Sequence, residues 1–278
     1  MAKNYGAVDI GGTKTLVAIF DSSGEIKEQN KFPTPQNYED FVKELAKNVD
    51  NLSTKEIQAF CVAAPGRVDR HRGIGIRFGN LGWENVTLIE DLEQIFKAPG
   101  MLENDAKSAA YSEAKELQKK YKKVLYITVS TGIGCGYIIN GIIDPKFADM
   151  EVGHMLLEHN GEFERWEDFA SGKAIVNKFG KKASDITDKK DWYIISRNIA
   201  VGLINVIATL TPDIIIVGGG VGSHLDKFKD QLDERLITYE NPMLTIPPIV
   251  KAKRPEEAVI YGCYELAKEK YGHSGKKT

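Results

Sequence analysis

Two short segments of the chain combine glycines with hydroxyl side chains in a pattern typical of phosphate binding. Residues 8–14 read Val-Asp-Ile-Gly-Gly-Thr-Lys, and residues 129–136 read Val-Ser-Thr-Gly-Ile-Gly-Cys-Gly. Each follows an apolar run and leads into another, 15–20 or 137–139, so each predicts a strand, a tight turn and a second strand. Turn amides that point the same way form a nest for phosphate oxygens. One loop in each half of the chain predicts a cleft that binds a polyphosphate from both sides.

An ordinary glycine hairpin accounts for either loop when it is taken alone. Asp9, however, ends the first strand where Mg²⁺ or its waters would sit, and Lys14 follows the turn. The chain contains no G-x-x-x-x-G-K-[ST] segment, and no G-x-G-x-x-G opens a helix after the first strand. The sequence therefore disfavours both a P-loop nucleotide site and a Rossmann dinucleotide site.

Composition narrows the class of protein further. The chain has 278 residues, 42% of them hydrophobic and 27% charged, which is ordinary for a soluble protein of one large or two smaller domains. The net charge of −2 argues against nucleic acid as a partner, and no uninterrupted apolar stretch predicts a membrane span. The three cysteines are widely spaced, as in a cytoplasmic protein with reduced thiols.

Hydrophobic periodicity predicts the same order of elements in both halves of the chain. In the first half we expect strands at 5–10, 15–21, 25–32, 57–64 and 100–103, with helices at 38–51, 87–97 and 106–117. In the second half we expect strands at 124–130, 137–140 and 213–217, with helices at 191–210, 223–239 and 255–271. A lysine-rich stretch at 119–123 is interpreted as a solvated link. This repetition predicts an internally duplicated α/β protein with its site near the carboxyl ends of strands.

Eight short motifs in order resemble those of the ROK family of sugar kinases, within the actin-like ATPase and hexokinase superfamily. They are Asp9-Ile10-Gly11-Gly12-Thr13-Lys14, Ala64-Pro65-Gly66, Asn80-Leu81-Gly82-Trp83, Glu103-Asn104-Asp105-Ala106, Ser130-Thr131-Gly132-Ile133-Gly134, Glu151-Val152-Gly153-His154, Glu167 with Ala170-Ser171-Gly172, and Val217-Gly218-Gly219-Gly220-Val221. Each motif is weak by itself, whereas their order along nearly the whole chain is specific.

The resemblance implies a duplicated fold of the actin-like ATPase and hexokinase type, with two domains flanking a cleft. The smaller domain would comprise residues 1–117 together with a returning final helix at 256–278, and the larger would comprise 118–255. The activity implied is ATP-dependent phosphorylation of a hexose hydroxyl, as in a glucokinase, in the cytoplasm. Neither nucleic acid nor a membrane is expected as a partner, and a homodimer is compatible with the resemblance.

The same resemblance assigns the site residues. Asp105 would be the general base, although its place at a strand-to-helix junction also suits a helix N-cap. The sugar would be bound by Asn80, Asn104, Asp105, Glu151, His154 and Glu167. ATP would be bound by Gly11, Gly12, Thr13, Lys14, Thr131, Gly132, Gly219 and Gly220. Asp9 would lie near Mg²⁺, which phosphates and waters would mostly hold. Trp83 and Trp166 are interpreted as packing residues.

One segment departs from the family pattern. Many members carry Cys-x-Cys-Gly-x-x-Gly-Cys-x-Glu, whose cysteines bind zinc, but here Glu158, Asn160 and Arg165 occupy the cysteine positions. A zinc site of three thiolates and a histidine therefore cannot form, and no zinc is expected. We expect a salt bridge between Glu158 and Arg165, and burial of Phe163 and Trp166, to hold residues 158–167 instead.

Three alternative functions remain open on the sequence. Polyphosphate-using glucokinases of this family also lack the zinc site, so polyphosphate competes with ATP as the expected donor. An N-acetylhexosamine kinase is the second alternative, because the choice of hexose depends on the shape of the pocket. The third is a sugar-binding regulatory protein, since the family includes repressors. Those need a helix-turn-helix ahead of the kinase-like domain, and the first strand is expected to begin near residue 5, which leaves no room for one.

Overall fold

The computed structural model describes residues 3–272. Contacts within the chain divide it into two compact units. Unit 1 comprises Met1–Ser112 and Glu257–Thr278, and unit 2 comprises Glu113–Glu256. Each unit is built around its own five-stranded sheet.

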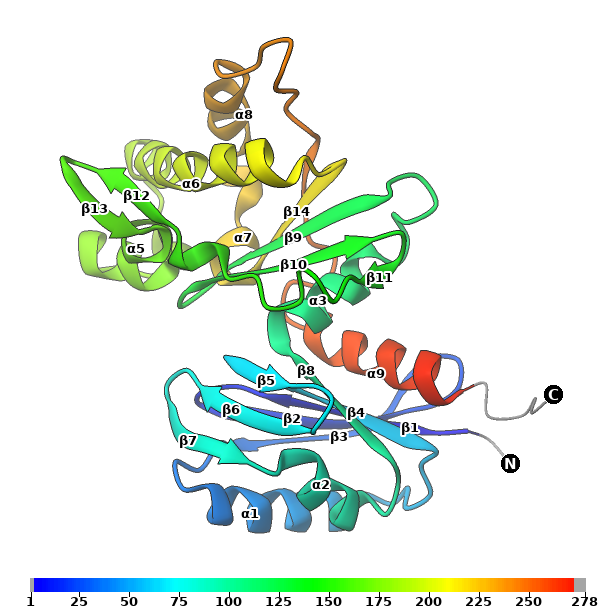
Figure 1. Ribbon diagram of the computed structural model, residues 1–278. Coiled ribbons are helices and arrows are strands. Elements are labelled where there is room, and N and C mark those ends of the chain that lie inside the picture. Colours follow the sequence, from blue (N-terminus) through cyan, green and yellow to red (C-terminus); the bar gives the residue numbers. More distant parts are fainter. Residues whose placement is uncertain (1–2, 273–278) are drawn as a thin grey trace. The chain divides into compact units, whose positions relative to one another are not determined.

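The sheet of unit 1 has the strand order β3-β2-β1-β4-β8 (Figure 1). Its strands are β1 (Tyr5–Ile10), β2 (Lys14–Phe20), β3 (Ile26–Pro33), β4 (Ala59–Ala64) and β8 (Gly100–Asn104). The first three strands are antiparallel, whereas β1, β4 and β8 run parallel. Parallel strands bring their carboxyl ends to one edge of a sheet, so β1 and β8 deliver the residues that follow them to the same edge.

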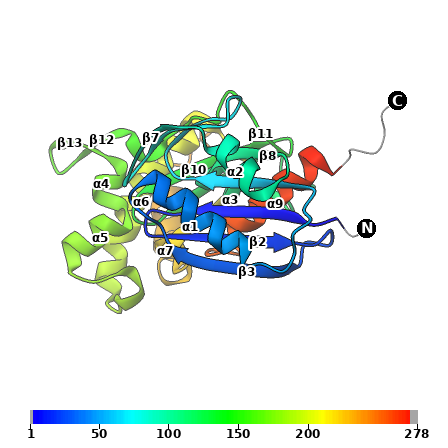
Figure 2. The same cartoon turned by 90° about the horizontal axis from the view of Figure 1, so that it is seen from below.

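Helices cover both faces of this sheet. The helices α1 (Tyr38–Asp50) and α2 (Leu88–Phe96) lie on one face (Figures 1 and 2) and share a core with it that includes Phe41, Leu45 and Leu92. The final helix α9 (Ala258–Tyr271) packs on the other face, where the small side chains of Ala7 and Cys61 admit Tyr264. The final helix therefore belongs to unit 1, although it is far from the other elements of that unit in the sequence.

A second, three-stranded sheet in unit 1 was not predicted from the sequence. Its antiparallel strands are β5 (Arg67–Asp69), β6 (Ile74–Phe78) and β7 (Leu81–Val86). The glycines and charged residues of this stretch break the apolar alternation that marks a half-buried strand. Trp83 is buried in the core of unit 1, where it contacts Phe41 and Phe78, so its predicted packing role is confirmed.

Unit 2 repeats the sheet pattern of unit 1. The strand order is β11-β10-β9-β14-β15, with β9 (Lys123–Val129), β10 (Ile133–Ile139), β11 (Ile142–Ile143), β14 (Ile214–Gly218) and β15 (Ile249–Lys251). The first three positions in this order are antiparallel and the last three are parallel, as in unit 1. The predicted duplicated α/β fold is confirmed.

The helices of unit 2 differ in part from the prediction. The α-helices of unit 2 are α4 (Trp166–Ala170), α5 (Gly172–Phe179), α6 (Lys189–Leu210), α7 (Gly219–Gly222) and α8 (Lys229–Ile237). The unit also contains the 3₁₀ turns η1 (Val152–His154), η2 (Ala183–Asp185) and η3 (Leu225–Lys227). The prediction of one helix over 223–239 is wrong, because α7 and η3 precede α8 and Phe228 has extended φ and near-zero ψ. The strands β12 (Leu156–His159) and β13 (Glu162–Arg165) form a separate hairpin.

The helix α6 is the long core helix of unit 2. Within the described part of the chain it is the one helix whose length and composition would suffice to cross a membrane, and 50% of its most apolar stretch is buried in the fold. Its buried residues, among them Trp192, Ile199 and Leu203, belong to the core beneath the sheet.

Candidate functional site

The first glycine loop joins β1 to β2 in unit 1. The N–H of Gly11 donates to the carbonyl of Lys14 at 3.0 Å, which closes the turn. A Cβ on Gly11 would lie 2.8 Å from that carbonyl oxygen, so the turn requires glycine here. Gly12 is half-buried, while Thr13 and Lys14 are exposed at the start of β2. The loop therefore presents its backbone and the Thr13 hydroxyl to solvent, as phosphate binding requires.

Thr34 holds this loop from its side, a role that sequence reasoning missed. Its hydroxyl donates to the carbonyl of Gly11 at 2.8 Å and lies 2.9 Å from the hydroxyl of Thr15. Its N–H donates to the carbonyl of Thr13 at 3.0 Å. Both threonine side chains are buried, so the loop rests on a satisfied polar cluster rather than on water. In the sequence, Thr34 is marked only by its place shortly after the strand predicted at 25–32.

Asp9 and Asp105 lie close enough to interact, although 95 residues separate them in the chain. The register explains this, because Asp9 pairs with Ala63 and Ala63 pairs with Glu103 across the parallel strands. Asp105 therefore follows β8 at the edge where Asp9 ends β1. Burial and the neighbouring Asp105 carboxyl raise the pKa of Asp9 from 3.8 to about 7, while Lys31 opposes the shift. A carboxylate of this kind is stabilised by a bound cation.

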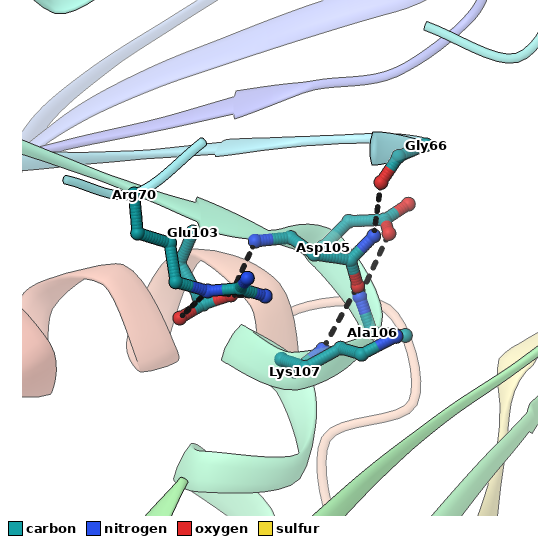
Figure 3. Close-up of polar contacts among 7 residues, drawn as sticks. Gly66, Arg70, Glu103, Asp105, Ala106 and Lys107 are labelled. Carbon is teal, nitrogen blue, oxygen red and sulfur yellow. Dashed lines mark hydrogen bonds and ion pairs between the residues drawn. The ribbon is translucent and has the colours of Figure 1, made fainter. Parts of the chain in front are cut away.

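Asn104 and Asp105 form the junction between β8 and α3 (Asp105–Ala114), shown in Figure 3. The Oδ1 of Asn104 accepts the N–H of Lys107 at 3.2 Å, and its Nδ2 donates to the carbonyl of Gly66 at 3.0 Å. Asn104 thus caps the helix, and the alternative interpretation of Asp105 as the N-cap is wrong. Asp105 is the first helical residue, and its Oδ1 accepts the N–H of Ala106 at 2.8 Å.

Asn80 lies beside the first glycine loop. It is exposed in the turn between β6 and β7, and its Cβ is 3.9 Å from the position a Cβ on Gly12 would take. The unpredicted small sheet is what brings Asn80 to this loop. In unit 1 the fold therefore groups Asn80 with the glycine loop and Asp9 with Asp105.

The second glycine loop, in unit 2, is shorter than predicted. The turn covers residues 130–132, where the N–H of Ser130 donates to the carbonyl of Gly132 at 2.9 Å. The strand β10 already begins at Ile133, so Gly134 and Gly136 are strand residues. The carbonyl of Ser130 accepts the N–H of Gly172 at 2.6 Å, and a Cβ on Gly172 would lie 2.6 Å from that oxygen. This close approach anchors the loop to the start of α5.

Glu167 connects this loop to His154. Its Oε1 lies 3.5 Å from Nε2 of His154, and its Oε2 accepts the N–H of Ile133 at 3.4 Å. A Cβ on Gly132 would lie 2.7 Å from Oε2, so the carboxylate occupies the space that glycine leaves. Glu151 is exposed directly before η1. The fold thus gathers Glu167, His154 and Gly132, and places Glu151 three residues from His154.

The segment in place of the zinc motif is held differently from the prediction. Arg165 pairs with Asp168, through Nε at 2.8 Å and Nη2 at 2.7 Å, and lies 3.4 Å from Oε1 of Glu167. The predicted Glu158–Arg165 salt bridge is wrong, because Glu158 instead accepts the N–H of Gly161 in the hairpin turn. Arg165 and Glu158 have opposite charges on one face of the hairpin, but this did not decide the partner of Arg165. The first turn of α4 places two carboxylates, Glu167 and Asp168, near Arg165 instead.

Aromatic packing completes the support of this hairpin. Trp166 is fully buried against Gly202 of α6, as predicted, but Phe163 is 76% exposed and its predicted burial is wrong. His159, to which the sequence assigned no role, stacks on Phe169 with ring centroids 4.2 Å apart and lies 2.9 Å from Glu164.

The third glycine segment follows β14. Gly219 has φ of +79°, and a Cβ there would lie 2.5 Å from the hydroxyl of Thr128 and 2.7 Å from the carbonyl of Val129. A Cβ on Gly220 would meet no atom within 4 Å. Gly219 is therefore required by the fold itself, whereas Gly220 leaves open backbone that a ligand could approach.

Comparison with known proteins identifies the family. The ROK family pattern matches residues 5–270. A fructokinase of Lactococcus lactis is 28% identical over 80% of this chain and 80% of its own, and a Streptomyces coelicolor glucokinase is 27% identical over 94% and 96%.

Solved structures share the fold. A ROK family glucokinase from Streptomyces griseus, in complex with glucose and AMPPNP, is 24% identical with a TM-score of 0.80 and coverage of 97% of this chain and 100% of that one. An inorganic polyphosphate/ATP-glucomannokinase from Arthrobacter is 27% identical with a TM-score of 0.72 and coverage of 95% and 98%. Because the family pattern spans residues 5–270, nearly the whole chain, this protein is a member of the ROK family.

Proposed function

We propose that the protein is a sugar kinase that transfers the terminal phosphoryl group of ATP to a hydroxyl of a hexose. The observation that carries the proposal is the Asp9–Asp105 pair at the carboxyl edge of β1 and β8, beside a glycine loop that presents its backbone. Phosphoryl transfer needs a positioned base and neutralisation of phosphate charge more than covalent chemistry by the protein.

The proposed roles follow from the chemistry of each group. A carboxylate oxygen of Asp105 accepts the proton of the sugar hydroxyl, whose oxygen attacks the terminal phosphorus while ADP leaves. Hydroxyls of the sugar bind to Asn80, Asn104, Asp105, Glu151, His154 and Glu167. Phosphates and nucleoside bind to Gly11, Gly12, Thr13, Lys14, Thr131, Gly132, Gly219 and Gly220. Asn104 already uses part of its amide in capping α3, which fixes the direction of its remaining donor.

Asp9 suits a magnesium ion held mainly by phosphates. Among residues 3–272 no cluster of three or more histidine, cysteine or acidic side chains could hold a metal by itself. Asp9 instead supplies one partly buried carboxylate, which fits an ion that keeps waters and phosphate oxygens as its other ligands. Bound Mg²⁺ would neutralise charge on the transferred phosphoryl group, and Asp9 would orient it.

The pKa of Asp9 gives a pH prediction with a defined sign. A raised pKa means that the folded state keeps a proton that the unfolded state has lost, so the free energy of unfolding falls as pH rises from about 4 to about 7. Asp9→Asn should therefore stabilise the apo protein more at pH 8 than at pH 5, as urea unfolding would measure. Binding of Mg²⁺ needs the ionised form, so the activity of the wild type should rise with pH through about 7.

Asp21→Asn is the matched control for this prediction. Hydrogen bonds from Ser23 and its neighbours hold the pKa of Asp21 below its usual value, so it stays ionised between pH 5 and 8. The effect of Asp21→Asn on stability should then be the same at both pH values. An equally pH-independent effect of Asp9→Asn would contradict the assignment.

The donor and the hexose are best tested together. We expect ATP to give a higher kcat/KM than polyphosphate, because the open backbone at Gly220 suits a nucleoside, which polyphosphate lacks. A panel of glucose, fructose, mannose and N-acetylated hexosamines, each with both donors, measures this. Equal kcat/KM with polyphosphate would overturn the preference. We further propose a cytoplasmic location, with a homodimer as the assembly to test by light scattering.

A further inference from the structure

A buried ion pair lies next to the proposed catalytic junction (Figure 3). Arg70 donates to Glu103 through Nε, at 2.8 Å to Oε1 and 3.0 Å to Oε2, and its Nη2 lies 2.7 Å from Oε1. The Glu103 side chain is 5% exposed and that of Arg70 is 24% exposed. Two-point bonding of this kind fixes the direction of a carboxylate as well as neutralising it.

Glu103, held in this way, in turn fixes the backbone of Asn104 by a hydrogen bond. Its Oε1 also accepts the N–H of Asn104 at 2.7 Å. The peptide so held joins Glu103 to Asn104, the last residue of β8, directly before Asp105. Asn104 is further fixed by Gly66 and Lys107 through its amide, so the residue before Asp105 is held at three points.

The turn that carries Arg70 is held by hydrogen bonds of its own. Asp69, the last residue of β5, accepts the N–H groups of His71 at 3.1 Å and Arg72 at 3.0 Å. This closes the chain around Arg70 and keeps its side chain on the β8 side of the small sheet. A guanidinium at this site is thus placed by the fold before any substrate binds.

We propose that Arg70 is a positioning residue for phosphoryl transfer, which acts through Glu103 to hold the Asn104 peptide and thereby aim Asp105 at the sugar hydroxyl. This inference rests on the proposed function. Without Arg70, Glu103 is left as a buried unpaired carboxylate, which must take up a proton or turn toward water. Either change removes the fixed acceptor of the Asn104 N–H.

Three variants test the inference by kinetics. Arg70→Met should lower kcat by about 10- to 100-fold, because misplacement of a catalytic group by about 1 Å costs that much. The sugar KM should change less, by about threefold at most, because most sugar contacts lie elsewhere. Glu103→Gln keeps a carbonyl acceptor for Asn104 and should lose less than Arg70→Met. The double variant Arg70→Met/Glu103→Gln should have a higher kcat than Arg70→Met, because it leaves no buried charge unpaired.

Arg77→Met is the matched control. Arg77 lies on β6 of the same small sheet, but its side chain is 77% exposed. Its Nε is 3.9 Å from the Glu84 carboxylate, which makes this a loose pair. Its kcat should stay within about twofold of wild type, as expected for an exposed pair. A wild-type kcat in Arg70→Met would overturn the inference. So would a double variant whose kcat is no higher than that of Arg70→Met.

Amide hydrogen exchange provides a readout that does not depend on activity. The Asn104 N–H should exchange at least about tenfold faster in Arg70→Met than in wild type or Arg77→Met, because its acceptor is lost. Unchanged exchange at Asn104 would refute the positioning role even if the protein proved to be an active kinase. Conversely, faster exchange at Asn104 in Arg70→Met, found for a protein whose wild type phosphorylates no hexose, would support the role of Arg70 in holding Asn104 and would refute the proposed function alone.

Discussion

Asp105→Asn is expected to lower kcat by about two to four orders of magnitude, the usual contribution of a general base. Asparagine keeps the size of aspartate and can still accept the N–H of Ala106, so the start of α3 should remain intact. What the variant loses is the oxygen that takes the proton of the sugar hydroxyl. The sugar KM should therefore change far less than kcat.

Steady-state kinetics with the preferred hexose and ATP would measure this effect. Asp40→Asn is a suitable control, because Asp40 is exposed on α1 and pairs with the exposed Lys43 in the first turns of that helix. Circular dichroism and unfolding midpoints of both variants should match the wild type. Turnover near the wild-type rate in Asp105→Asn would remove Asp105 from the role of base.

Trp166→Ala is expected to have the largest effect on stability, a loss of about 3–5 kcal/mol in the free energy of unfolding. The indole is fully buried and fills the space above Gly202, where a Cβ would lie only 2.0 Å from the ring. Its Nε1 also donates to the carbonyl of Asn198 at 3.2 Å. Removing the ring leaves a cavity between α4 and α6 and removes this hydrogen bond.

Two substitutions in the same segment are matched controls. Phe163→Ala removes an aromatic ring that is mostly exposed, so its effect on urea unfolding should be small. Arg165→Ala removes an exposed ion pair with Asp168 and should also cost much less than Trp166→Ala. Equal destabilisation by Arg165→Ala and Trp166→Ala would mean that the ion pair, rather than the buried ring, holds the hairpin to the rest of unit 2.

Local sequence signals were sufficient wherever structure depends on neighbours in the chain. The strand-turn-strand at Gly11 is set by glycine conformation and by apolar runs on both sides, and it was predicted to within a residue. The second loop was predicted at the correct place but with too many residues. The glycines at 134 and 136 suggest a turn, although both lie in β10 and pair with β9. Pairing with a neighbouring strand outweighs the weak β-propensity of glycine.

Charge and aromatic partners were predicted less well. Glu158 and Arg165 have opposite charges, yet Arg165 turns to Asp168 because the first turn of α4 brings that carboxylate nearer. Phe163 and Trp166 look alike in sequence, and only the position of α6 makes one buried and the other exposed. Burial depends on what packs against a residue, which the local pattern does not contain.

By itself the sequence determined the two glycine loops, the duplicated α/β order and the motifs that mark a ROK family member, since these depend on residue type and spacing. Tertiary structure decided which groups act on one another. Asp9 meets Asp105 because three parallel strands set their register, and Arg70 reaches Glu103 because an unpredicted small sheet carries it there. Such pairs are fixed by long-range packing, whose free energy comes from surfaces far apart in the chain.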